Sequence, residues 1–246
     1  MKQLGLIGRT LGHSFSAKYF AEKFEREGLT EDFAYGLYEL PEIEDVEGFI
    51  SSTPNLLGFN VTIPYKQQII PYLDDLTDEA RSIGAVNCVK IFADGRKVGY
   101  NTDVDGIRIT LDKLLGGEAV KSALVLGSGG ASQAVQFVLT EQGIDCLVVS
   151  RNSASGDITY DQLSAEVMEA NRLIINTSPV GMYPNVEQSP NLPYHLLDSR
   201  HFLFDLVYNP QVTLFMERGM AQGAKAVSGL DMLYAQAESA WQIWTR

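Results

Sequence analysis

Two short loops each combine one ionisable side chain with several hydroxyl and amide groups. The first loop, residues 58–66, reads Gly-Phe-Asn-Val-Thr-Ile-Pro-Tyr-Lys and ends at Lys66. The second, residues 99–106, reads Gly-Tyr-Asn-Thr-Asp-Val-Asp-Gly and contains Asp103. A lysine and a carboxylate among neutral donors and acceptors suit binding of a polyhydroxylated small molecule and transfer of one proton. The neutral groups are those of Asn60, Thr62, Asn101 and Thr102.

Lys66 and Asp103 can be interpreted as an acid–base pair. Hydride transfer to a ketone carbon leaves negative charge on its oxygen, which a nearby ammonium would stabilise and protonate. A carboxylate beside that ammonium would keep it charged and direct it. Two plainer interpretations stay open: Lys66 as an ordinary surface lysine, and Asp103 as the N-cap of the helix that it begins.

A third loop, Gly127-Ser128-Gly129-Gly130-Ala131, offers a place for a nucleotide phosphate. A strand is expected before it and a helix after it, as in a βαβ nucleotide-binding unit. Glycines let the backbone approach a pyrophosphate, and a helix N-terminus presents unpaired N–H groups. Alone, the loop is also consistent with a tight strand–helix turn. With the first two loops, it indicates a reductase that acts on a polyol-like ketone.

The end of the next expected strand, residues 146–149, discriminates between the two nicotinamide cofactors. An NAD site usually carries Asp or Glu there, which holds the ribose hydroxyl. This chain instead has Ser150, Arg151 and Asn152. A cation with two polar groups fits a 2′-phosphate, so NADP is favoured over NAD. A solvated surface arginine is the alternative for Arg151.

Composition argues against several classes of partner. The formal charge is −12 in 246 residues without a basic run, which disfavours nucleic acid and anionic membranes. No stretch approaches the roughly 20 apolar residues of a membrane span, and residues 4–8 are too short for a signal-peptide core. None of the three histidines has a neighbour at ligand spacing, so no metal is expected. Cys88 and Cys146 are expected to be reduced thiols in a cytoplasmic protein.

Alternating strand and helix patterns predict a parallel α/β architecture, with a change of pattern near Asp103. Ser16 is a candidate N-cap for the first helix. In the closing helix, one face is predicted to carry Leu230, Leu233, Tyr234, Ala237, Trp241 and Trp244. Strands are expected at residues 4–8, 35–40, 57–61, 86–92, 97–101, 122–126, 146–149, 173–175, 202–206 and 224–227, with a hairpin turn through Asp94-Gly95. Helices are expected at residues 16–27, 43–50, 103–115, 131–142, 160–169, 213–222 and 230–244, with a helical turn opening at Thr77-Asp78.

A series of motifs, in order along essentially the whole chain, resembles the shikimate dehydrogenases. They are Gly-His-Ser-x-Ser at residues 12–16, Asn-Val-Thr-x-Pro-x-Lys at 60–66, Gly-Ala-Val-Asn at 84–87, Asn-Thr-Asp-x-x-Gly at 101–106, Gly-x-Gly-Gly-Ala at 127–131, Asn-Thr-Ser-Pro-x-Gly-Met at 176–182 and Asp-Leu-Val-Tyr-Asn-Pro at 205–210. The closing helix adds Gly-Leu-Asp-Met-Leu at 229–233 and Gln-Ala at 236–237. Several motifs in the right order are far more specific than any one of them.

The resemblance implies two α/β domains with the active site in the cleft between them. Residues 1–102 plus 229–246 would form the substrate domain, and residues 103–228 a Rossmann-like NADP-binding domain. The implied reaction is the reversible NADPH-dependent reduction of 3-dehydroshikimate to shikimate, on the pathway to aromatic amino acids. Lys66 would be the acid/base and Asp103 its partner.

The resemblance also implies roles for further residues by matching position. Ser14, Ser16 and Tyr208 would hold the substrate carboxylate and nearby groups. Thr62, Asn87, Asp103 and Gln236 would bind ring hydroxyls. NADP would be held by Gly127, Ser128, Gly129, Gly130 and Ala131 and by Ser150, Arg151 and Asn152, while Leu206 and Gly229 would line its nicotinamide end, with Asp78 near it.

The chain departs from the family pattern at several positions. Residues 153–155 are Ser-Ala-Ser without the second arginine that the family often has there, so the strictness of the preference for NADP over NAD is not determined by this motif. One alternative is therefore a quinate/shikimate dehydrogenase with relaxed cofactor use, and another is a catalytically silent dinucleotide-binding sensor. A monomer and a homodimer are both compatible with the sequence. The remaining departures are Ala17, Phe20 and Ala21, where the family has Pro and His-Asn, and Cys88 in place of Thr; His13 is interpreted as a structural loop residue. Separately, Ser132 stands where the general dinucleotide-binding fingerprint has its third glycine.

Overall fold

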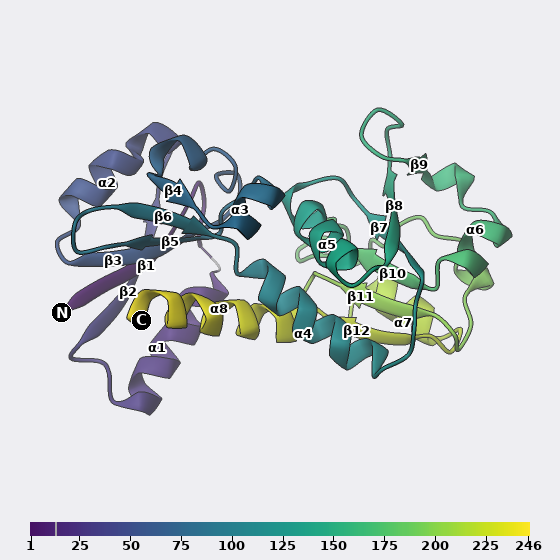
Figure 1. Ribbon diagram of the computed structural model, residues 1–246. Helices are drawn as coiled ribbons and strands as arrows, with labels where there is room; N and C mark the ends of the chain where they lie inside the picture. The colour runs from purple at the N-terminus through teal and green to yellow at the C-terminus, as the bar shows by residue number, and fades with distance from the viewer. Residues whose placement is uncertain (13) are drawn as a thin grey trace. The chain divides into compact units, whose positions relative to one another are not determined.

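The chain forms two compact units, each built around one six-stranded sheet (Figure 1). The computed structural model describes residues 1–12 and 14–246, so His13 of the Gly-His-Ser motif lies outside the described residues. Unit 1 comprises Met1–Thr102 and Ala237–Arg246, and unit 2 comprises Asp103–Gln236.

The sheet of unit 1 is mixed. Its strands are β1 (Lys2–Gly8), β2 (Phe33–Glu39), β3 (Leu56–Val61), β4 (Asp75–Leu76), β5 (Cys88–Ile91) and β6 (Lys97–Tyr100), in the order β2-β1-β3-β5-β6-β4. β1 pairs in parallel with β2 and β3, whereas β5 is antiparallel to β3 and β6. The predicted hairpin turn between β5 and β6 is confirmed: Gly95 has a φ of 86°, a left-handed conformation that favours glycine.

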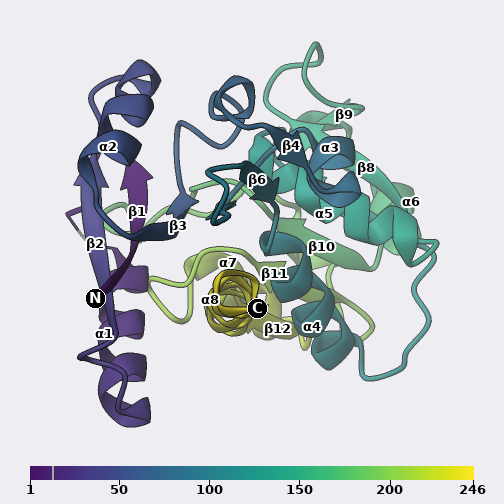
Figure 2. The same ribbon diagram turned by 60° about the vertical axis from the view of Figure 1, so that its left-hand side comes forward.

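Helices cover both faces of this sheet because alternate strand residues point to opposite sides. The helices are α1 (Phe15–Glu27), η1 (Ile43–Asp45), α2 (Val46–Ser52), η2 (Ile70–Tyr72), α3 (Asp78–Ile83) and the C-terminal part of α8 (Leu230–Thr245). Ile7 of β1 packs with Phe49 of α2, whereas Leu4 packs with Phe20 of α1 and Trp244 of α8. Figure 1 shows α2 above the sheet and α1 below it, and α1 contacts β1 and β2 (Figure 2).

Several helix boundaries in unit 1 differ from the sequence prediction. Ser14, not Ser16, is the N-cap residue of α1, and no side-chain capping hydrogen bond is formed. The helix expected at residues 43–50 begins as the 3₁₀ turn η1 and continues as α2 to Ser52. The turn predicted at Thr77 is confirmed, since the Thr77 hydroxyl oxygen accepts the Ala80 N–H at 3.2 Å and begins α3. The predicted apolar face of α8 is wrong at Tyr234, which is 45% exposed.

The sheet of unit 2 is parallel throughout. Its strands are β7 (Ser122–Leu126), β8 (Asp145–Ser150), β9 (Ile158–Thr159), β10 (Leu173–Asn176), β11 (Phe202–Asp205) and β12 (Lys225–Ser228). Their order is β12-β11-β10-β7-β8-β9. Within the unit this is the Rossmann order, with the switch point between β7 and β10. Ligands of such sheets bind beyond the carboxyl ends of the strands at that point.

Both faces of the second sheet are also covered. Its helices are α4 (Asp103–Leu115), α5 (Gly130–Glu141), η3 (Tyr160–Gln162), α6 (Ala165–Ala170), η4 (Tyr194–Leu196) and α7 (Leu214–Met220), with the first part of α8. Leu124 of β7 packs with Met168 of α6 and Phe215 of α7. Val125, which points to the opposite face, is equally buried, and α5 contacts β7 and β8.

The helix predicted at residues 160–169 is wrong as a single element. The structure divides it into η3 and α6, because the Ser164 side chain accepts the Val167 N–H and begins a new helix there. The buried Leu163 between them supplied the apolar spacing that made the segment look continuous.

Three further findings concern the described residues. Across residues 1–12 and 14–246, no helix is long and apolar enough to cross a membrane. The same ranges contain no cluster of three or more His, Cys, Asp or Glu side chains that could hold a metal ion. Cys88 and Cys146 are free thiols, Cys88 buried and Cys146 half-buried.

Candidate active site

The strand register of unit 1 brings loops that are distant in sequence to one edge of its sheet. β1 and β3 are parallel, with Ile7 opposite Val61, so the loops after them leave at the same edge. β5 runs antiparallel to β3 and begins one residue after Asn87. β6 ends one residue before Asn101. Residues 58–61 of the predicted loop belong to β3, and the loop that follows, residues 62–66, meets Asn87 and Asn101 at this edge of unit 1.

Asn87 has a fixed side-chain orientation at this edge. Its Oδ1 accepts the Thr102 N–H at 2.7 Å and the Thr102 hydroxyl at 3.2 Å. Both donors identify the acceptor end of the amide, so Nδ2 is the end that donates. The residue is only 3% exposed. The orientation of the Asn87 amide is therefore fixed within unit 1.

Asn60 and Asn101 connect neighbouring segments at this edge, because their side-chain amides donate hydrogen bonds to backbone carbonyls. Asn60 Nδ2 donates to Asn87 O at 3.1 Å, and Asn101 Nδ2 donates to Ala85 O at 2.9 Å. The Tyr35 hydroxyl donates to Asn60 Oδ1 at 2.8 Å and is hydrogen-bonded to the Ser16 side chain. Burial raises the pKa of Tyr35 well above its usual value, so the hydroxyl stays neutral. Loop composition alone did not indicate this scaffolding role.

The backbone that carries Lys66 is anchored on both sides. The carbonyl of Lys66 accepts the Val86 N–H at 2.7 Å. The preceding Tyr65 is fully buried, and its hydroxyl donates to Leu40 O at 2.7 Å and Pro41 O at 2.9 Å. Lys66 itself is half-buried in unit 1, at the end of the loop that begins with Thr62. Its position is set by the loop and not by a helix start.

Ser14 carries an unusual hydroxyl. Its Oγ is buried, forms no cap on α1, and has no hydrogen-bond partner among the described residues. Buried polar groups nearly always have a partner, so an unpartnered one calls for an explanation. A ligand oxygen is the explanation that the sequence resemblance supplies.

Three predicted site residues begin or lie on helices. Asp103 begins α4 in unit 2 and is 8% exposed, where a carboxylate in the first turn also favours the helix N-terminus. Gln236 of α8 is 9% exposed, and its Nε2 donates to Leu233 O at 3.1 Å. Asp78 is an exposed residue in the first turn of α3. Asp78 therefore stabilises the N-terminus of α3, and this role does not depend on a ligand.

The glycine loop of unit 2 lies at the Rossmann switch point. β7 ends at Leu126, Gly127 has a φ of 110°, and α5 begins at Gly130 with Gly129 as N-cap residue. A Cβ added at Gly129 or Gly130 would meet no protein atom within 4 Å, so protein packing does not require glycine there. Open space above these residues fits a pyrophosphate approaching the backbone and the helix N-terminus. Ser132, at the third fingerprint position, is fully buried and accepts a hydrogen bond from Gln136 Nε2 at 3.0 Å.

The end of β8 forms a tight polar loop beside the glycine loop. β7 and β8 are parallel with Leu126 opposite Val149, so residues 150–152 lie at the same sheet edge as Gly127. Ser150 Oγ is 2.8 Å from Ser155 Oγ, and Asn152 Oδ1 accepts the Ala154 N–H at 2.9 Å. Arg151 is exposed on this loop. An exposed guanidinium on a rigid hydroxyl-rich turn fits a phosphate group.

The segment after β11 carries two more predicted residues. Leu206 and Tyr208 are half-buried, and burial raises the pKa of the Tyr208 hydroxyl. Gly229 packs so closely that an added Cβ would lie 2.2 Å from Leu206 O, which explains the glycine. Sequence analysis assigned no role to the fully buried Asp205 that precedes this segment. The signal that could have found it is a single carboxylate ending an apolar strand.

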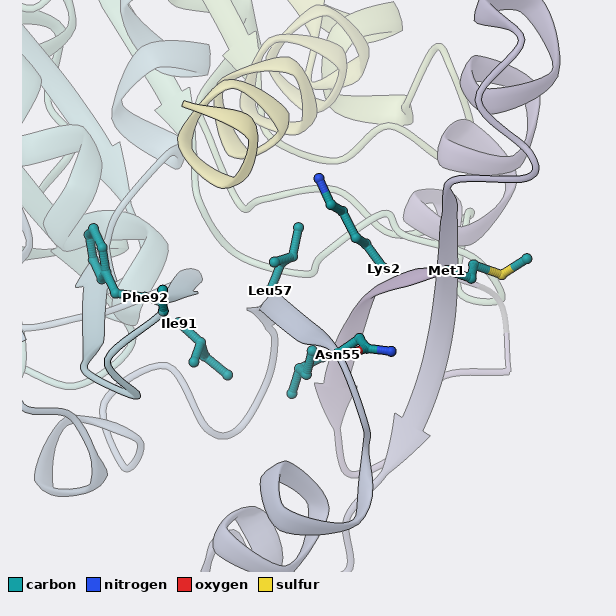
Figure 3. Close-up of a pocket in the computed structure, with 8 residues that line it drawn as sticks. Met1, Lys2, Asn55, Leu57, Ile91 and Phe92 are labelled. Carbon is teal, nitrogen blue, oxygen red and sulfur yellow. The ribbon is translucent and has the colours of Figure 1, made fainter.

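A surface hollow in unit 1 lies at the other sheet edge from the loop that carries Lys66. It is lined at the start of β1 and β3 and at the end of β5, by Met1, Lys2, Asn55, Leu57, Ile91 and Phe92 among others (Figure 3). Because these are the opposite ends of the strands from the loop that carries Lys66, the hollow contains none of the predicted site residues.

By fold, unit 2 has the Rossmann strand order, and unit 1 is an α/β unit with polar side chains at one sheet edge. Residues 6–89 match the shikimate dehydrogenase substrate binding domain. The chain is 36% identical to a shikimate dehydrogenase (NADP(+)) from Methanococcus maripaludis, over 99% of this chain and 91% of that protein. A crystal structure of shikimate 5-dehydrogenase from Thermus thermophilus in complex with NADP(H) and shikimate has a TM-score of 0.86 and 32% identity, covering 100% of this chain and 94% of that one. A quinate dehydrogenase from Corynebacterium glutamicum in complex with NAD has a TM-score of 0.89 and 25% identity, covering 99% and 93%.

The chain belongs to the shikimate dehydrogenase family. The family assignment confirms the resemblance drawn from the sequence motifs and the α/β fold class with a Rossmann-like part. It also confirms the expectation of an NADP-linked oxidoreductase.

Proposed function

We propose that this protein catalyses the reversible NADPH-dependent reduction of 3-dehydroshikimate to shikimate. The observation that carries the proposal is the buried hydroxyl of Ser14, which has no hydrogen-bond partner among residues 1–12 and 14–246 and which a substrate oxygen would satisfy. The chain also belongs to the shikimate dehydrogenase family. The directed amide of Asn87 supports the proposal, because a polyhydroxylated ring needs donors of fixed geometry.

Substrate binding is assigned to neutral polar groups. Ser14, Ser16 and Tyr208 would hold the carboxylate and nearby groups. Ring hydroxyls would bind to Thr62, Asn87, Asp103 and Gln236. Since the chain has a formal charge of −12, these local donors must hold an anionic substrate that long-range attraction does not favour.

Proton transfer is assigned to Lys66. Its ammonium would stabilise and protonate the oxygen that becomes negative as the carbonyl carbon is reduced. Asp103 would keep the amine cationic and accept a hydrogen bond from the reacting hydroxyl. In the reverse oxidation the neutral amine would act as the base that accepts the hydroxyl proton.

NADPH, when bound, supplies the hydride. The backbone of Gly127, Ser128, Gly129, Gly130 and Ala131 would hold its pyrophosphate, and the open space above Gly129 and Gly130 fits that role. Ser150, Arg151 and Asn152 would hold the 2′-phosphate, with no carboxylate in residues 150–156 to repel it. Leu206, Gly229 and Asp78 are assigned to the nicotinamide end.

Consumption of NADPH by the purified protein with 3-dehydroshikimate is the decisive experiment. We expect turnover with this substrate and release of shikimate, identified by chromatography. Binding of NADPH without turnover would instead support the catalytically silent sensor. A parallel reaction without 3-dehydroshikimate controls for unspecific oxidation of NADPH.

A quinate/shikimate dehydrogenase with relaxed cofactor use is the second candidate. It is favoured by the single arginine in residues 150–156 and by the similarity to a quinate dehydrogenase that was crystallised with NAD. Steady-state kinetics with shikimate and quinate, each with NADP and NAD, separate the two. A kcat/KM for quinate and NAD close to that for shikimate and NADP would support this second candidate.

We also assign roles to the two domains, a cellular location and a class of partner. Residues 1–102 and 229–246 are assigned to the substrate, and residues 103–228 to NADP. The free thiols of Cys88 and Cys146 support a cytoplasmic location, and the acidic composition supports small-molecule partners over nucleic acid. A monomer and a homodimer both remain compatible with this activity.

A further inference from the structure

Asp205 is a fully buried carboxylate to which the proposed mechanism gives no task. It ends β11 in unit 2 and accepts three hydrogen bonds. Oδ1 accepts from Asn176 Nδ2 at 2.9 Å and from the Val207 N–H at 3.0 Å. Oδ2 accepts from the Thr213 hydroxyl at 2.5 Å. The carboxylate is therefore a single point where three donors converge.

Each donor belongs to a different segment at the carboxyl edge of the sheet. Asn176 ends β10, and its Oδ1 accepts the N–H of Ser178 at 3.1 Å and its hydroxyl at 2.6 Å. Val207 lies in the loop after β11. Thr213 is the N-cap of α7, where its hydroxyl accepts the Met216 N–H. Asp205 thus ties the loops after two neighbouring strands to the start of a helix.

The loop after β11, which contains Val207, carries two residues that are assigned to ligands. The Val207 N–H that Asp205 holds lies between Leu206 and Tyr208. The same stretch is held from its other side, because Val207 O accepts the Gly229 N–H at 3.3 Å and the Leu206 N–H donates to Asn176 O at 2.9 Å. Charge-assisted hydrogen bonds are roughly twice as strong as neutral ones, so the ionised carboxylate is the strongest of these restraints.

We propose that the Asp205 carboxylate is a positioning residue for the reaction: by holding the Val207 N–H, it fixes Leu206 against the nicotinamide and Tyr208 against the substrate. This inference rests on the proposed function of those two residues. It adds to that function a residue that touches neither ligand.

The energetics of the site favour a functional reason for the charge. Burial raises the pKa of Asp205 to about 6, although its three donors act in the opposite direction. The folded protein therefore disfavours the ionised form relative to the unfolded chain, so the charge does not stabilise the fold. Tyr194 of η4 interacts electrostatically with Asp205, and burial raises the pKa of Tyr194 to about 12. Asp205 is then the group of this pair that titrates between pH 5 and 8.

The variant Asp205→Asn removes the charge and keeps the shape. Its Oδ1 can still face Val207 and Asn176 while its Nδ2 faces the Thr213 oxygen. At pH 8 we expect kcat for 3-dehydroshikimate reduction to fall about fivefold, the difference between a charged and a neutral hydrogen bond. Binding of adenosine 2′,5′-bisphosphate, which lacks the nicotinamide, should stay unchanged. The fluorescence of bound NADPH, which reports the nicotinamide environment without turnover, should change.

A pH series separates positioning from a general structural role. Protonation converts wild-type Asp205 into a neutral group, so the ratio of wild-type to Asp205→Asn kcat should approach one as the pH falls to about 5. Titrations of the substrate and of NADPH are common to both proteins and cancel in this ratio.

Thr213→Val is the matched second variant. It removes one donor from the same carboxylate and the cap of α7 but leaves the Val207 N–H in place. Loss of a donor raises the pKa of Asp205 further. This variant should keep kcat within twofold of wild type at pH 8 and lose activity at a higher pH than wild type as the solution is acidified. It tests the inference even if Asp205→Asn does not fold.

Three results would overturn the positioning role: an Asp205→Asn kcat within twofold of wild type at pH 8, a kcat ratio that does not change with pH, or an unchanged fluorescence of bound NADPH. If the wild-type protein binds NADPH but does not reduce 3-dehydroshikimate, the proposed function fails. The NADPH fluorescence of Asp205→Asn still decides whether Asp205 positions the loop, so the two failures are distinguishable.

Discussion

Asn87 and Ser14 illustrate how single polar residues prepare the edge of unit 1 for a ligand. Asn87 is turned by two hydrogen bonds from Thr102, so its donor end has one direction. Ser14 has a buried hydroxyl without a partner among the described residues. Leaving such a hydroxyl unsatisfied costs about 1–3 kcal/mol, which a ligand oxygen would recover. Both residues therefore favour binding of a molecule rich in oxygen.

Lys66→Ala should lower kcat by roughly 10²- to 10⁴-fold with only a modest change in KM, because it removes the general acid. Steady-state rates of 3-dehydroshikimate reduction measure this effect. Lys66→Arg should also fail, since a guanidinium does not give up its proton. The control is Lys18→Ala on α1, a lysine whose side chain is 77% exposed and which should leave kcat unchanged. Near-normal turnover of Lys66→Ala would refute the assignment.

Arg151→Ala should weaken NADP binding by about 10- to 100-fold while NAD binding changes little, since only NADP carries a 2′-phosphate. Equilibrium titration of both cofactors gives the comparison. Arg172→Ala serves as a control, because Arg172 is an exposed arginine next to β10 at the opposite end of the strand. Equal losses for NADP and NAD would reject a contact between Arg151 and the 2′-phosphate.

At the residue scale, the sequence indicated which side chains could bind a ligand or transfer a proton, but it did not indicate the hydrogen bonds that hold such side chains in place. Residue type and position indicated Lys66 and Arg151, whereas Asn87 was indicated only by the resemblance of its motif to the family. The catalytic and binding roles of all three stay predictions. The supporting contacts of Asn60 and Asp205 were not predicted. Asn60 Nδ2 donates to Asn87 O, which is distant in sequence. Asp205 Oδ1 accepts the backbone N–H of Val207 in the loop that follows β11. Residue type alone does not encode such partners.

Among the elements, α1 and the end of α8 are joined by a charge cluster around the buried ammonium of Lys23. Lys23 has a side chain only 5% exposed, and its Nζ donates to Glu27 at 2.9 Å and to Glu238 at 2.9 Å. The Tyr19 hydroxyl also donates to Glu238. The ammonium lies 5.5 Å from the centre of the Trp241 ring. This cluster fixes the C-terminal part of α8 against α1 within unit 1.

The two partners of this cluster should differ in their contribution to stability. Glu238→Ala leaves a buried ammonium with one carboxylate fewer, so it should lower the free energy of unfolding by about 2–3 kcal/mol. Lys23→Met leaves carboxylates that are 36% and 40% exposed and can turn to water, so it should cost less than about 1 kcal/mol. Urea unfolding followed by tryptophan fluorescence is a suitable measurement, because the only two tryptophans, Trp241 and Trp244, lie in unit 1.

An exposed pair on the same helix is the matched control for this comparison. Lys18 and Glu22 are 77% and 62% exposed, and Glu22→Ala should change stability by less than about 0.5 kcal/mol. Equal destabilisation by Glu238→Ala and Lys23→Met would contradict the argument from burial.

The main elements followed from the sequence because their periodicity reflects burial. Most strands and helices lie within a few residues of the predicted ranges, and the glycine loop stands where the βαβ pattern put it. The two-residue strands β4 and β9 were missed, since two residues carry no alternation. The antiparallel insertion of β5 and β6 was indicated by Asp94-Gly95, but the resulting mixed sheet order depends on long-range pairing.

For the whole chain, acidity sets the background for every pH effect. Asp and Glu number 31 against 19 Lys and Arg, so the folded protein is anionic at neutral pH. Several ion pairs of the folded protein are exposed, such as Arg81 with Asp75. Exposed pairs contribute at most about 1 kcal/mol each to the free energy of unfolding. A group with a large effect on the pH dependence of stability must therefore be buried.

Asp205 is such a group, and it should make stability fall as the pH rises. Its pKa is about 6 in the folded protein and about 3.9 in an unfolded chain, so its favourable contribution is complete below pH 4 and is lost as the pH rises through 6. A difference of about two pKa units corresponds to about 3 kcal/mol. From pH 4 to pH 8, wild type should lose this amount relative to Asp205→Asn, in which the background of all other acidic groups is the same. Thermal or urea unfolding followed by far-ultraviolet circular dichroism measures the difference. A stability difference between the two proteins that stays constant across this range would show that the buried carboxylate titrates alike in the folded and unfolded chains.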